Sequence, residues 1–484
     1  MKKAILIILK KAGNFKELES LVFRFICSLT RSVLSEILEL VDKELMEERD
    51  KGRLEYLEKR KREIMTLFGP LKIRRRYYYD RKEGEYRFLL DEKFNIPAND
   101  RKSPLIKEFT VLMLKDESYR KSAEKVSKKA EGSVSHTAIW NWIQQLGSKL
   151  RKELEVKKEN LFEWGTLPEG KGEKKEADYL YTEADGTYVY LQNEEKDKGE
   201  IKLGISYEGW EKRHPMSEKH ELVNKKYFGG EFDSTEFWKG VETKVYENYD
   251  PGVEFKTVLN GDGASWIDTG KEYLPKFVLR NLDEFHINRR IFHALGGSKY
   301  MERIQEAIEN ENKEALKKHL QEAKSYRHTK KGKEKVEKLK KYLLDHWQQL
   351  IDYRKRDIEL PEDAQGMGGI ESNIDKMIVH RCKNEGMRWS KEGIKNLIKI
   401  LVAAENGELK EKIEEQNWNF KEEGEITKAC RKVEDKMRKK NQEPPQRGKL
   451  PVIEGPKAGE DWVKAFRRIA NPVLNNPIDK GIWV

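Results

Sequence analysis

Two aspartates lie at the ends of predicted β-strands and could share a metal ion. Asp185 ends a predicted strand over 178–185, and Asp262 lies between Gly261 and Gly263 after a predicted strand over 254–260. If the strands are ordered 3-2-1-4-5, these two strands are neighbours and the two carboxylates lie side by side. Carboxylates that close repel each other unless a cation lies between them. Mg²⁺ prefers oxygen ligands and keeps positions open for phosphate oxygens.

A third acid, Glu371, follows the glycine-rich segment 366–370 at the start of a predicted helix. Its carboxylate could reach the same metals. Two Mg²⁺ ions about 3.5–4 Å apart would hold the attacking and leaving oxygens of a phosphodiester displacement. The alternatives are ordinary turn or cap aspartates at 185 and 262, and Asp375 as the third acid one helical turn later.

Several other reaction classes are disfavoured because their motifs are absent. The sequence has no Gly-x4-Gly-Lys-Ser/Thr, His-Glu-x-x-His, Gly-x-Ser-x-Gly or Gly-x-Gly-x-x-Gly pattern. P-loop NTP hydrolysis, zinc proteolysis and α/β-hydrolase chemistry therefore lose most of their support.

The composition favours a nucleic-acid partner. The 484 residues include 97 Lys and Arg against 86 Asp and Glu, which gives a net charge of +11. Such a surplus points to nucleic acid, or less often to an anionic membrane surface. Cys27, Cys382 and Cys430 form no Cys-x-x-Cys pair, so we expect neither a disulfide framework nor a zinc cluster, and a cytoplasmic location. No segment approaches the ~20 apolar residues of a membrane span.

The N-terminal third is expected to be helical with one basic hairpin. We predict that residues 1–67 form a helical region, within which Asn14 and Glu17 form a capping box that marks a helix start. Apolar residues at helical spacing make this helix pack on its own protein or on a partner helix. We predict a hairpin within 68–100, with strands over 71–79 and 86–90. Its arginines suit phosphate contacts or a solvated strand; they are Arg74, Arg75 and Arg76.

A helix-turn-helix-like region is predicted over 101–150. One helix spans 118–130, and Ser135 caps a second that ends at Gly147. The first residues of the second helix would face the major groove. A charged connector over 148–176 follows.

The remainder is expected to alternate strands and helices. We predict a mixed sheet from strands over 178–185, 187–192, 201–207, 254–260 and 277–279. Residues 287–365 are predicted to be helical and basic, with one apolar face: Val336, Leu339, Leu343, Trp347, Leu350 and Ile351. Helix resumes over 371–405, and residues 421–484 form a basic tail.

Five segments in a fixed order resemble a known family. They are Glu183-Ala-Asp-Gly186, Gly261-Asp-Gly-Ala-Ser-Trp-Ile267, Leu282-Asp-Glu-Phe-His286, Gly369-Ile-Glu-Ser372 and Arg381-Cys-Lys-Asn-Glu-Gly-Met-Arg-Trp-Ser390. This set resembles the ISLre-type transposases of bacterial insertion sequences, long described as an uncharacterised protein family. These proteins are related to Mutator-like DDE transposases. The resemblance covers nearly the whole chain.

The resemblance implies an α+β multidomain fold with a helical N-terminal DNA-binding region. An RNase H-like mixed α/β core, over 177–286 and 366–420, would be interrupted by the all-helical insertion over 287–365. Asp185, Asp262 and Glu371 would be the catalytic acids and the ligands of Mg²⁺, with Mn²⁺ as a substitute. His286, in an Asp-x-x-His signature, would join the catalytic residues.

The expected activity is that of a DNA transposase. It would bind terminal inverted repeats and catalyse Mg²⁺-dependent strand cleavage and strand transfer on double-stranded DNA. We expect a homodimer or larger assembly, no membrane association, and a cytoplasmic, nucleoid-associated location. The alternatives are a non-catalytic DNA-binding copy and an RNase H-like structure-specific nuclease.

Six further residues have open roles. Glu183 points to the same strand face as Asp185 and is a salt-bridge partner or a spare ligand, of which we favour the former. His286 orients a phosphate or Asp283, or is structural. Trp389 is expected in the core. Three basic residues hold DNA phosphates or lie on a solvated face: Arg381, Lys383 and Arg388.

Overall fold

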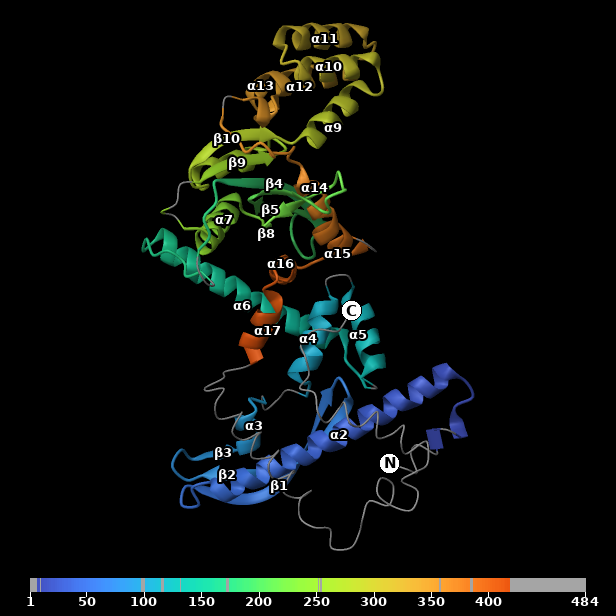
Figure 1. Cartoon of the computed structure of the whole chain (residues 1–484), viewed down its shortest axis with the longest axis vertical. Helices are drawn as coiled ribbons and strands as arrows, with labels where there is room; N and C mark the ends of the chain where they lie inside the picture. Colours follow the sequence, from blue (N-terminus) through green and yellow to red (C-terminus); the bar gives the residue numbers. More distant parts are fainter. Residues whose placement is uncertain are drawn as a thin grey trace. The chain divides into compact units, whose positions relative to one another are not determined.

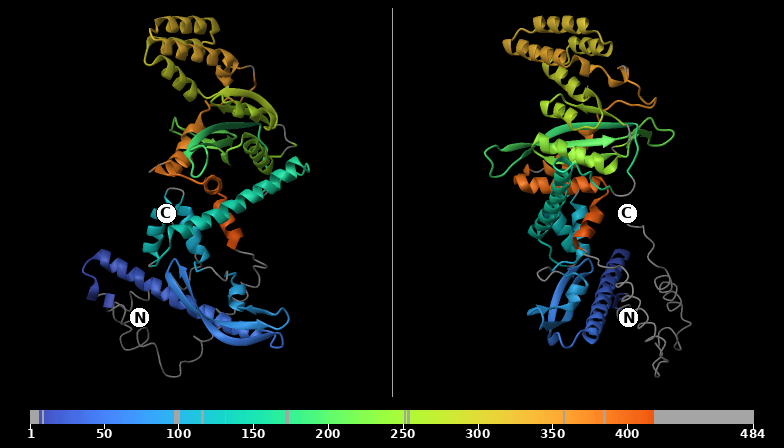
Figure 2. Two further views of the ribbon diagram at one scale, coloured as in Figure 1. Left: turned by 180° about the vertical axis from the view of Figure 1, so that it is seen from behind. Right: turned by 90° about the vertical axis from the view of Figure 1, so that its left-hand side faces the viewer.

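The computed structural model describes residues 7–417, except 9, 97–100, 115–116, 131, 171–173, 251, 253–254, 357 and 384–385. Its described residues divide into two compact units. The first comprises residues up to 106 together with 128–132, and the second comprises 107–127 and 133–417 (Figures 1 and 2). The predicted tail over 421–484 lies outside the described residues, as does Cys430.

The first unit packs one long helix on a small sheet. Helix α2 (Phe15–Glu48) begins at Asn14, whose side chain accepts a hydrogen bond from the Glu17 N–H at 3.0 Å, as predicted. The strands β1 (Leu54–Thr66), β2 (Gly69–Asp80) and β3 (Glu85–Arg87) form an antiparallel sheet in that order, and α3 (Leu89–Lys93) follows. Val41 of α2 shares a core with Ile64, Leu71, Ile73 and Leu90.

Two predictions for this unit were wrong. Residues 54–66 form strand β1 rather than helix, paired with β2 from Leu54–Asp80 to Thr66–Gly69. Because β1 carries many charged residues, the alternation of inward and outward side chains that marks a strand is not recognisable in its sequence. Hydrogen bonding to β2 through a tight turn stabilises the extended conformation. The second hairpin strand ends at Arg87 instead of Leu90, because Leu90 is buried in the core as part of α3.

The hairpin arginines are mostly used inside the protein. Arg75 is buried, pairs with Asp91 and lies over the Phe88 ring. Arg76 pairs with Asp42 at 2.6 Å. Of the three, Arg74 alone is exposed, so a phosphate contact by Arg75 or Arg76 is not supported.

Three helices come next in sequence: α4 (Pro104–Met113), α5 (Tyr119–Lys129) and α6 (His136–Phe162). The Ser135 hydroxyl caps α6 by accepting from the Ala138 N–H at 3.1 Å, as predicted. However, α6 continues past Gly147 into the predicted connector. A Cβ on Gly147 would lie 2.6 Å from Asn396 Cα, so this glycine allows a close helix crossing instead of ending the helix.

The second unit is built on a mixed sheet ordered β10-β9-β4-β5-β8. Its strands are β4 (Tyr179–Tyr190), β5 (Lys198–Tyr207), β8 (Lys226–Glu231), β9 (Lys256–Gly261) and β10 (Phe277–Leu282). Strands β4, β5 and β8 are antiparallel neighbours, whereas β9 and β10 run parallel to β4. Helix α7 (Ser234–Asn248) packs Trp238 on Leu180 and Leu259 of the sheet. Strands β6 (Gly209–Lys212) and β7 (His220–Val223) form a separate hairpin, and α8 (Ser265–Asp268) and η1 (Thr269–Glu272) follow β9.

The predicted break at Gly186 does not exist. Residues 179–190 form one continuous strand, and β8 was missed. Gly186 pairs with Lys202 inside the strand, and a Cβ there would meet only the flexible Glu200 side chain, 2.7 Å from its carboxylate oxygen. The predicted neighbourhood of the two aspartate-bearing strands is confirmed, since β4 and β9 pair in parallel.

A helical segment separates the sheet from the third acid. It comprises α9 (Glu284–Leu295), α10 (Lys299–Glu309), α11 (Lys313–Tyr326), α12 (Lys330–Asp345), α13 (Trp347–Leu350) and η2 (Tyr353–Lys355). The predicted apolar face is confirmed: Val336, Leu339, Leu343, Trp347 and Leu350 are buried in one core, and Ile351 packs against it. The lysines of α12 are exposed or half-buried.

The predicted helix over 371–405 is interrupted. Helix α14 (Gly369–Ile374) passes through a π-helical turn, η3 (Asp375–Val379), into α15 (His380–Cys382). Trp389 then packs in the core as predicted, with its indole N–H bonded to the Cys382 carbonyl at 2.8 Å. Ser390 caps α16 (Lys391–Glu405), and α17 (Leu409–Asn417) follows. Among the described residues, no helix combines the length and apolar character that crossing a bilayer requires.

Candidate active site

Strand pairing brings Asp185 and Asp262 to neighbouring positions. The parallel register of β4 and β9 ends with Ala184 opposite Gly261, and each aspartate is the next residue. Asp185 therefore lies within a strand, not at its end as predicted. Asp262 does follow its strand, and Gly263 continues with φ +82°, a left-handed conformation that favours glycine.

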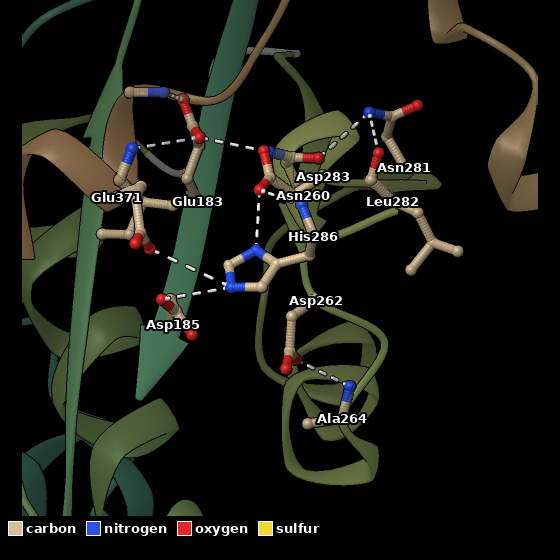
Figure 3. A network of polar contacts seen from close by, with 12 residues as sticks. Glu183, Asp185, Asn260, Asp262, Ala264, Asn281, Leu282, Asp283, His286 and Glu371 are labelled. Atoms are coloured by element: carbon tan, nitrogen blue, oxygen red, sulfur yellow. Dashed lines mark hydrogen bonds and ion pairs between the residues drawn. The ribbon is translucent and has the colours of Figure 1, made fainter. Parts of the chain in front are cut away.

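The tightest group of possible ligand atoms belongs to Asp185, Glu371 and His286. One ligand atom from each lies within 4.8 Å of the others. The His286 Nε2 atom is 3.9 Å from Asp185 Oδ2 and 3.9 Å from Glu371 Oε2. Figure 3 shows these three side chains pointing toward one another. The Asp262 carboxylate is outside this group and accepts a hydrogen bond from the Ala264 N–H at 2.9 Å.

Asp283 fixes the orientation of His286. It precedes α9, and its Oδ2 atom lies 2.7 Å from His286 Nδ1. The Asp283 N–H donates to the Gly261 carbonyl at 2.9 Å, which ties the start of α9 to the end of β9. Because Nδ1 is engaged, the other ring nitrogen faces the carboxylates (Figure 3). Of the contacts considered for His286, the structure shows the one with Asp283, and a phosphate contact stays a prediction.

Burial and neighbouring charges shift the pKa values of Asp185 and His286. Burial raises the pKa of Asp185 to about 7, and the Asp262 and Glu371 carboxylates add to this, whereas His286 and the Gly186 N–H oppose it. Burial lowers the pKa of His286, but its hydrogen bond to Asp283 and the charge of Asp185 outweigh burial and raise it. The electrostatic contribution of Asp262 to both groups places its charge within interaction range.

Glu183 is neither a salt-bridge partner nor a spare ligand. It is fully buried, and its carboxylate accepts four hydrogen bonds from neutral donors. These are the Tyr207 hydroxyl at 2.7 Å, Asn260 Nδ2 at 3.1 Å, and the N–H groups of Gly369 at 3.1 Å and Ile370 at 3.4 Å. The favoured salt-bridge interpretation was therefore wrong. Glu183 connects β4, β5 and β9 to the helix that carries Glu371. In the sequence, the only indication of this role is that Glu183 lies two residues before Asp185, on the same face of the strand.

The basic residues beyond Glu371 have different roles. Arg381 is buried, donates to the Leu114 carbonyl at 2.7 Å and lies over the Tyr119 ring, so a DNA contact is ruled out for it. Lys383 donates to Thr187 Oγ1 at 2.6 Å; burial lowers its pKa, although Glu371 and Asp185 oppose this. Arg388 is exposed and lies 3.8 Å from Asp197. Asp375, the alternative third acid, is exposed and outside the group.

A family model described as "Uncharacterised protein family (UPF0236)" matches residues 8–419. This chain belongs to the UPF0236 family. A UPF0236 protein of Caldanaerobacter subterraneus subsp. tengcongensis, whose name joins eleven loci, is 29% identical over 404 residues, which are 83% of this chain and 80% of the relative. Another from the same organism, whose name joins two loci, is 28% identical over 83% of this chain and 76% of the relative. The "UPF0236 protein in vanSb 3′region" of Streptococcus gallolyticus is 28% identical over 83% of this chain and 85% of the relative. The family thus has multiple paralogues in one bacterial genome.

The acidic donors of this UPF0236 chain fit a hard divalent cation. Asp185 and Glu371 offer carboxylate oxygens within 4.8 Å of each other, and Asp262 adds a third carboxylate directly after the neighbouring strand. Oxygen donors of this kind suit Mg²⁺ and Mn²⁺. His286 Nε2 faces the same space, and its partner Asp283 resembles the carboxylates that orient histidines at metal sites.

Proposed function

We propose that this protein is the DDE transposase of an insertion sequence, with an RNase H-like catalytic core. The observation that carries the proposal is the convergence of three acids from separate parts of the chain. Asp185 lies in β4, Asp262 follows the parallel neighbour β9, and Glu371 is placed beside Asp185 by α14. Counted along the chain as β4, β5, β8, β9 and β10, the strands of the sheet have the order 3-2-1-4-5, with β5 antiparallel to β4. The second and third strands are β5 and β8, not the predicted strands over 187–192 and 201–207. This order supports the proposal.

Asp185, Asp262 and Glu371 would hold the metal. Bound Mg²⁺, or Mn²⁺ as a substitute, would supply activation of water or a 3′-hydroxyl and stabilisation of the leaving oxygen. Glu183 keeps Glu371 in reach, and Asp283 holds the His286 ring so that its Nε2 can exchange a proton or contact a phosphate oxygen. Lys383, beside Thr187, would bind a DNA phosphate next to the acids.

Double-stranded DNA is the proposed partner. The start of α6 presents an exposed, mostly polar face that includes His136, Trp140 and Asn141, which suits the helix-turn-helix-like role of reading terminal repeats. The lysines of α12 would hold phosphates without sequence preference. Such a protein would act in the cytoplasm at the nucleoid, and handling two ends together would require a dimer or larger assembly.

The family's distribution supports a mobile element. Relatives in one genome have names that join eleven loci and two loci. Multiple near-identical copies in a genome are what transposition produces.

The test is cleavage of the element's own terminal DNA with Mg²⁺ or Mn²⁺, comparing wild type with Asp262→Asn. Asp375→Asn is the matched control, because Asp375 is exposed and outside the acidic group. We expect metal-dependent nicking by wild type and the control, and its loss in Asp262→Asn. Undiminished nicking by Asp262→Asn would remove this residue from the site. Tight binding without cleavage would favour the non-catalytic alternative, and equal cleavage of generic branched DNA would favour the nuclease.

A further inference from the structure

Helix α2 has a second apolar face besides the one on its own sheet. Leu34, Leu38, Val41 and Leu45 face the core formed with β1 and β2. Seven other apolar side chains of α2 are between 38% and 78% exposed. Phe23 lies on the side of the sheet-facing residues, and the other six form the stripe: Phe15, Val22, Ile26, Leu29, Val33 and Leu40. At about 100° per residue, these six fall within roughly 60° of arc, about 120° around the helix from the sheet-facing residues. The right-hand view of Figure 2 shows α2 lying along the small sheet.

The exposed residues are spaced for packing against another helix. From Val22 to Val33 they are separated alternately by four and three residues, the spacing of a coiled-coil seam. The whole stripe runs for roughly 38 Å at 1.5 Å per residue.

The stripe is also symmetric about its own midpoint. Phe15 matches Leu40, Val22 matches Val33, and Ile26 matches Leu29, all around the point between residues 27 and 28. In an antiparallel pair with a two-fold axis at this point, each residue meets its match on the other copy. The stripe is therefore complementary to itself.

The charges of α2 favour the same arrangement. Residues 15–31 carry three basic and two acidic side chains, whereas residues 32–48 carry one basic and six acidic ones. A parallel pair would place two acidic halves together. An antiparallel pair about the same midpoint places residues 32–40 of one copy beside residues 15–23 of the other, where Lys16 faces Glu39.

We propose that two copies of this chain associate through antiparallel pairing of their α2 helices. Phe15, Val22, Ile26, Leu29, Val33 and Leu40 form the seam. This inference does not rest on the proposed catalytic function, because its test uses neither DNA nor metal.

The first experiment is sedimentation of the full-length protein over a range of concentrations. We expect a dimer, and Leu29→Glu should raise its dissociation constant at least about tenfold because it buries unpaired carboxylates at the seam. Ser28→Glu is the matched control, since Ser28 is exposed but outside the stripe. An unchanged far-ultraviolet circular dichroism spectrum of Leu29→Glu would establish that the fold is intact, since loss of the dimer by itself lowers the Tm. A wild type that stays monomeric, or a dimer that resists Leu29→Glu, overturns the proposal.

A second pair of experiments tests the direction of pairing. In the antiparallel pair Glu19 would face Glu36 of the other copy, so Glu36→Lys should replace a repulsive contact by an attractive one and tighten the dimer several-fold. In a parallel pair Glu36 would face Glu36, and the same change would replace one repulsive contact by another. Val22→Cys mixed with Val33→Cys should form a disulfide-linked heterodimer under mild oxidation. Cross-linking of Val22→Cys alone, without the mixed product, would mean a parallel pair and overturn the proposal.

Discussion

The Glu183 Oε1 atom accepts a hydrogen bond from the backbone N–H of Gly369 at 3.1 Å, although the two residues are 186 positions apart in the chain. Glu183 lies in β4, two residues before Asp185, and Gly369 is the first residue of α14, two residues before Glu371. One buried carboxylate therefore sets the position of one proposed ligand relative to another.

Glu183→Gln should destabilise the protein by roughly 1–3 kcal/mol, because all four contacts are donors and an amide nitrogen cannot accept from them. Thermal or urea unfolding measures this. Metal-dependent cleavage should fall more than DNA binding does. The control, Glu194→Gln in an exposed loop, should change neither. Equal unfolding of both variants and wild type would contradict the role assigned to Glu183.

Asp283→Asn should lower the pKa of His286. The hydrogen bond and charge of Asp283 are what oppose the lowering by burial, and the amide removes the charge while keeping an oxygen to cap α9. The titration of the His286 ring by NMR measures the shift directly. Since a raised pKa keeps the ring protonated at higher pH, the histidine should become neutral at lower pH in the variant. A titration that does not move would mean that Asp283 has no electrostatic role.

Asp185→Asn should stabilise the metal-free protein at pH 8 by roughly 2–5 °C in Tm. Burial raises the pKa of Asp185 to about 7, so its contribution to stability is complete below the unfolded pKa of about 4 and is lost as the pH rises through about 7. The advantage of the variant should therefore shrink steadily from pH 7 to pH 4. Differential scanning fluorimetry measures it. A gain that is equal at pH 8 and pH 4 would show that charge burial is not its cause.

Addition of Mg²⁺ or Mn²⁺ should raise the Tm of wild type at pH 8 and leave that of Asp185→Asn nearly unchanged, because a ligand that binds the folded state stabilises it. Asp375→Asn should respond as wild type does. Equal stabilisation of wild type and Asp185→Asn would place the metal elsewhere.

Gly147→Ala should cost roughly 1–3 kcal/mol, since its Cβ would lie 2.4 Å from the Asn396 carbonyl oxygen, on backbone that cannot move easily. Gly240→Ala is the matched control in α7. Its Cβ would meet only Leu154 Cδ2 at 3.8 Å, so the better helix propensity of alanine should stabilise the protein by about 0.5–1 kcal/mol. Chemical unfolding of the two variants should therefore shift in opposite directions.

The sequence by itself determined the local features. Caps at Asn14 and Ser135 were found because an N-cap residue bonds within three residues of itself. The apolar face around Leu339 and Leu343 was found because one helix repeats its own period. The proximity of Asp185 and Asp262 followed from pairing two strands whose apolar character marked them. The resemblance to the ISLre-type transposases rested on five segments, including those with the three acids, in a fixed order along the chain.

Only the tertiary structure decided what depends on partners distant in sequence. Residues 54–66 were predicted to be helical, but hydrogen bonding to β2 makes them strand β1. Gly186 and Gly147 were predicted to end their elements, but β4 continues through Gly186 and α6 continues through Gly147, where the missing side chain lets the Asn396 backbone approach. Glu183 was predicted to form a salt bridge with a basic side chain. In the fold, its carboxylate instead accepts hydrogen bonds from four neutral donors in β5, β9 and α14. Hydrogen bonds and packing between segments tens to hundreds of residues apart produce no periodic pattern in the sequence. Each such contact depends on which distant residue the complete fold places beside the first one.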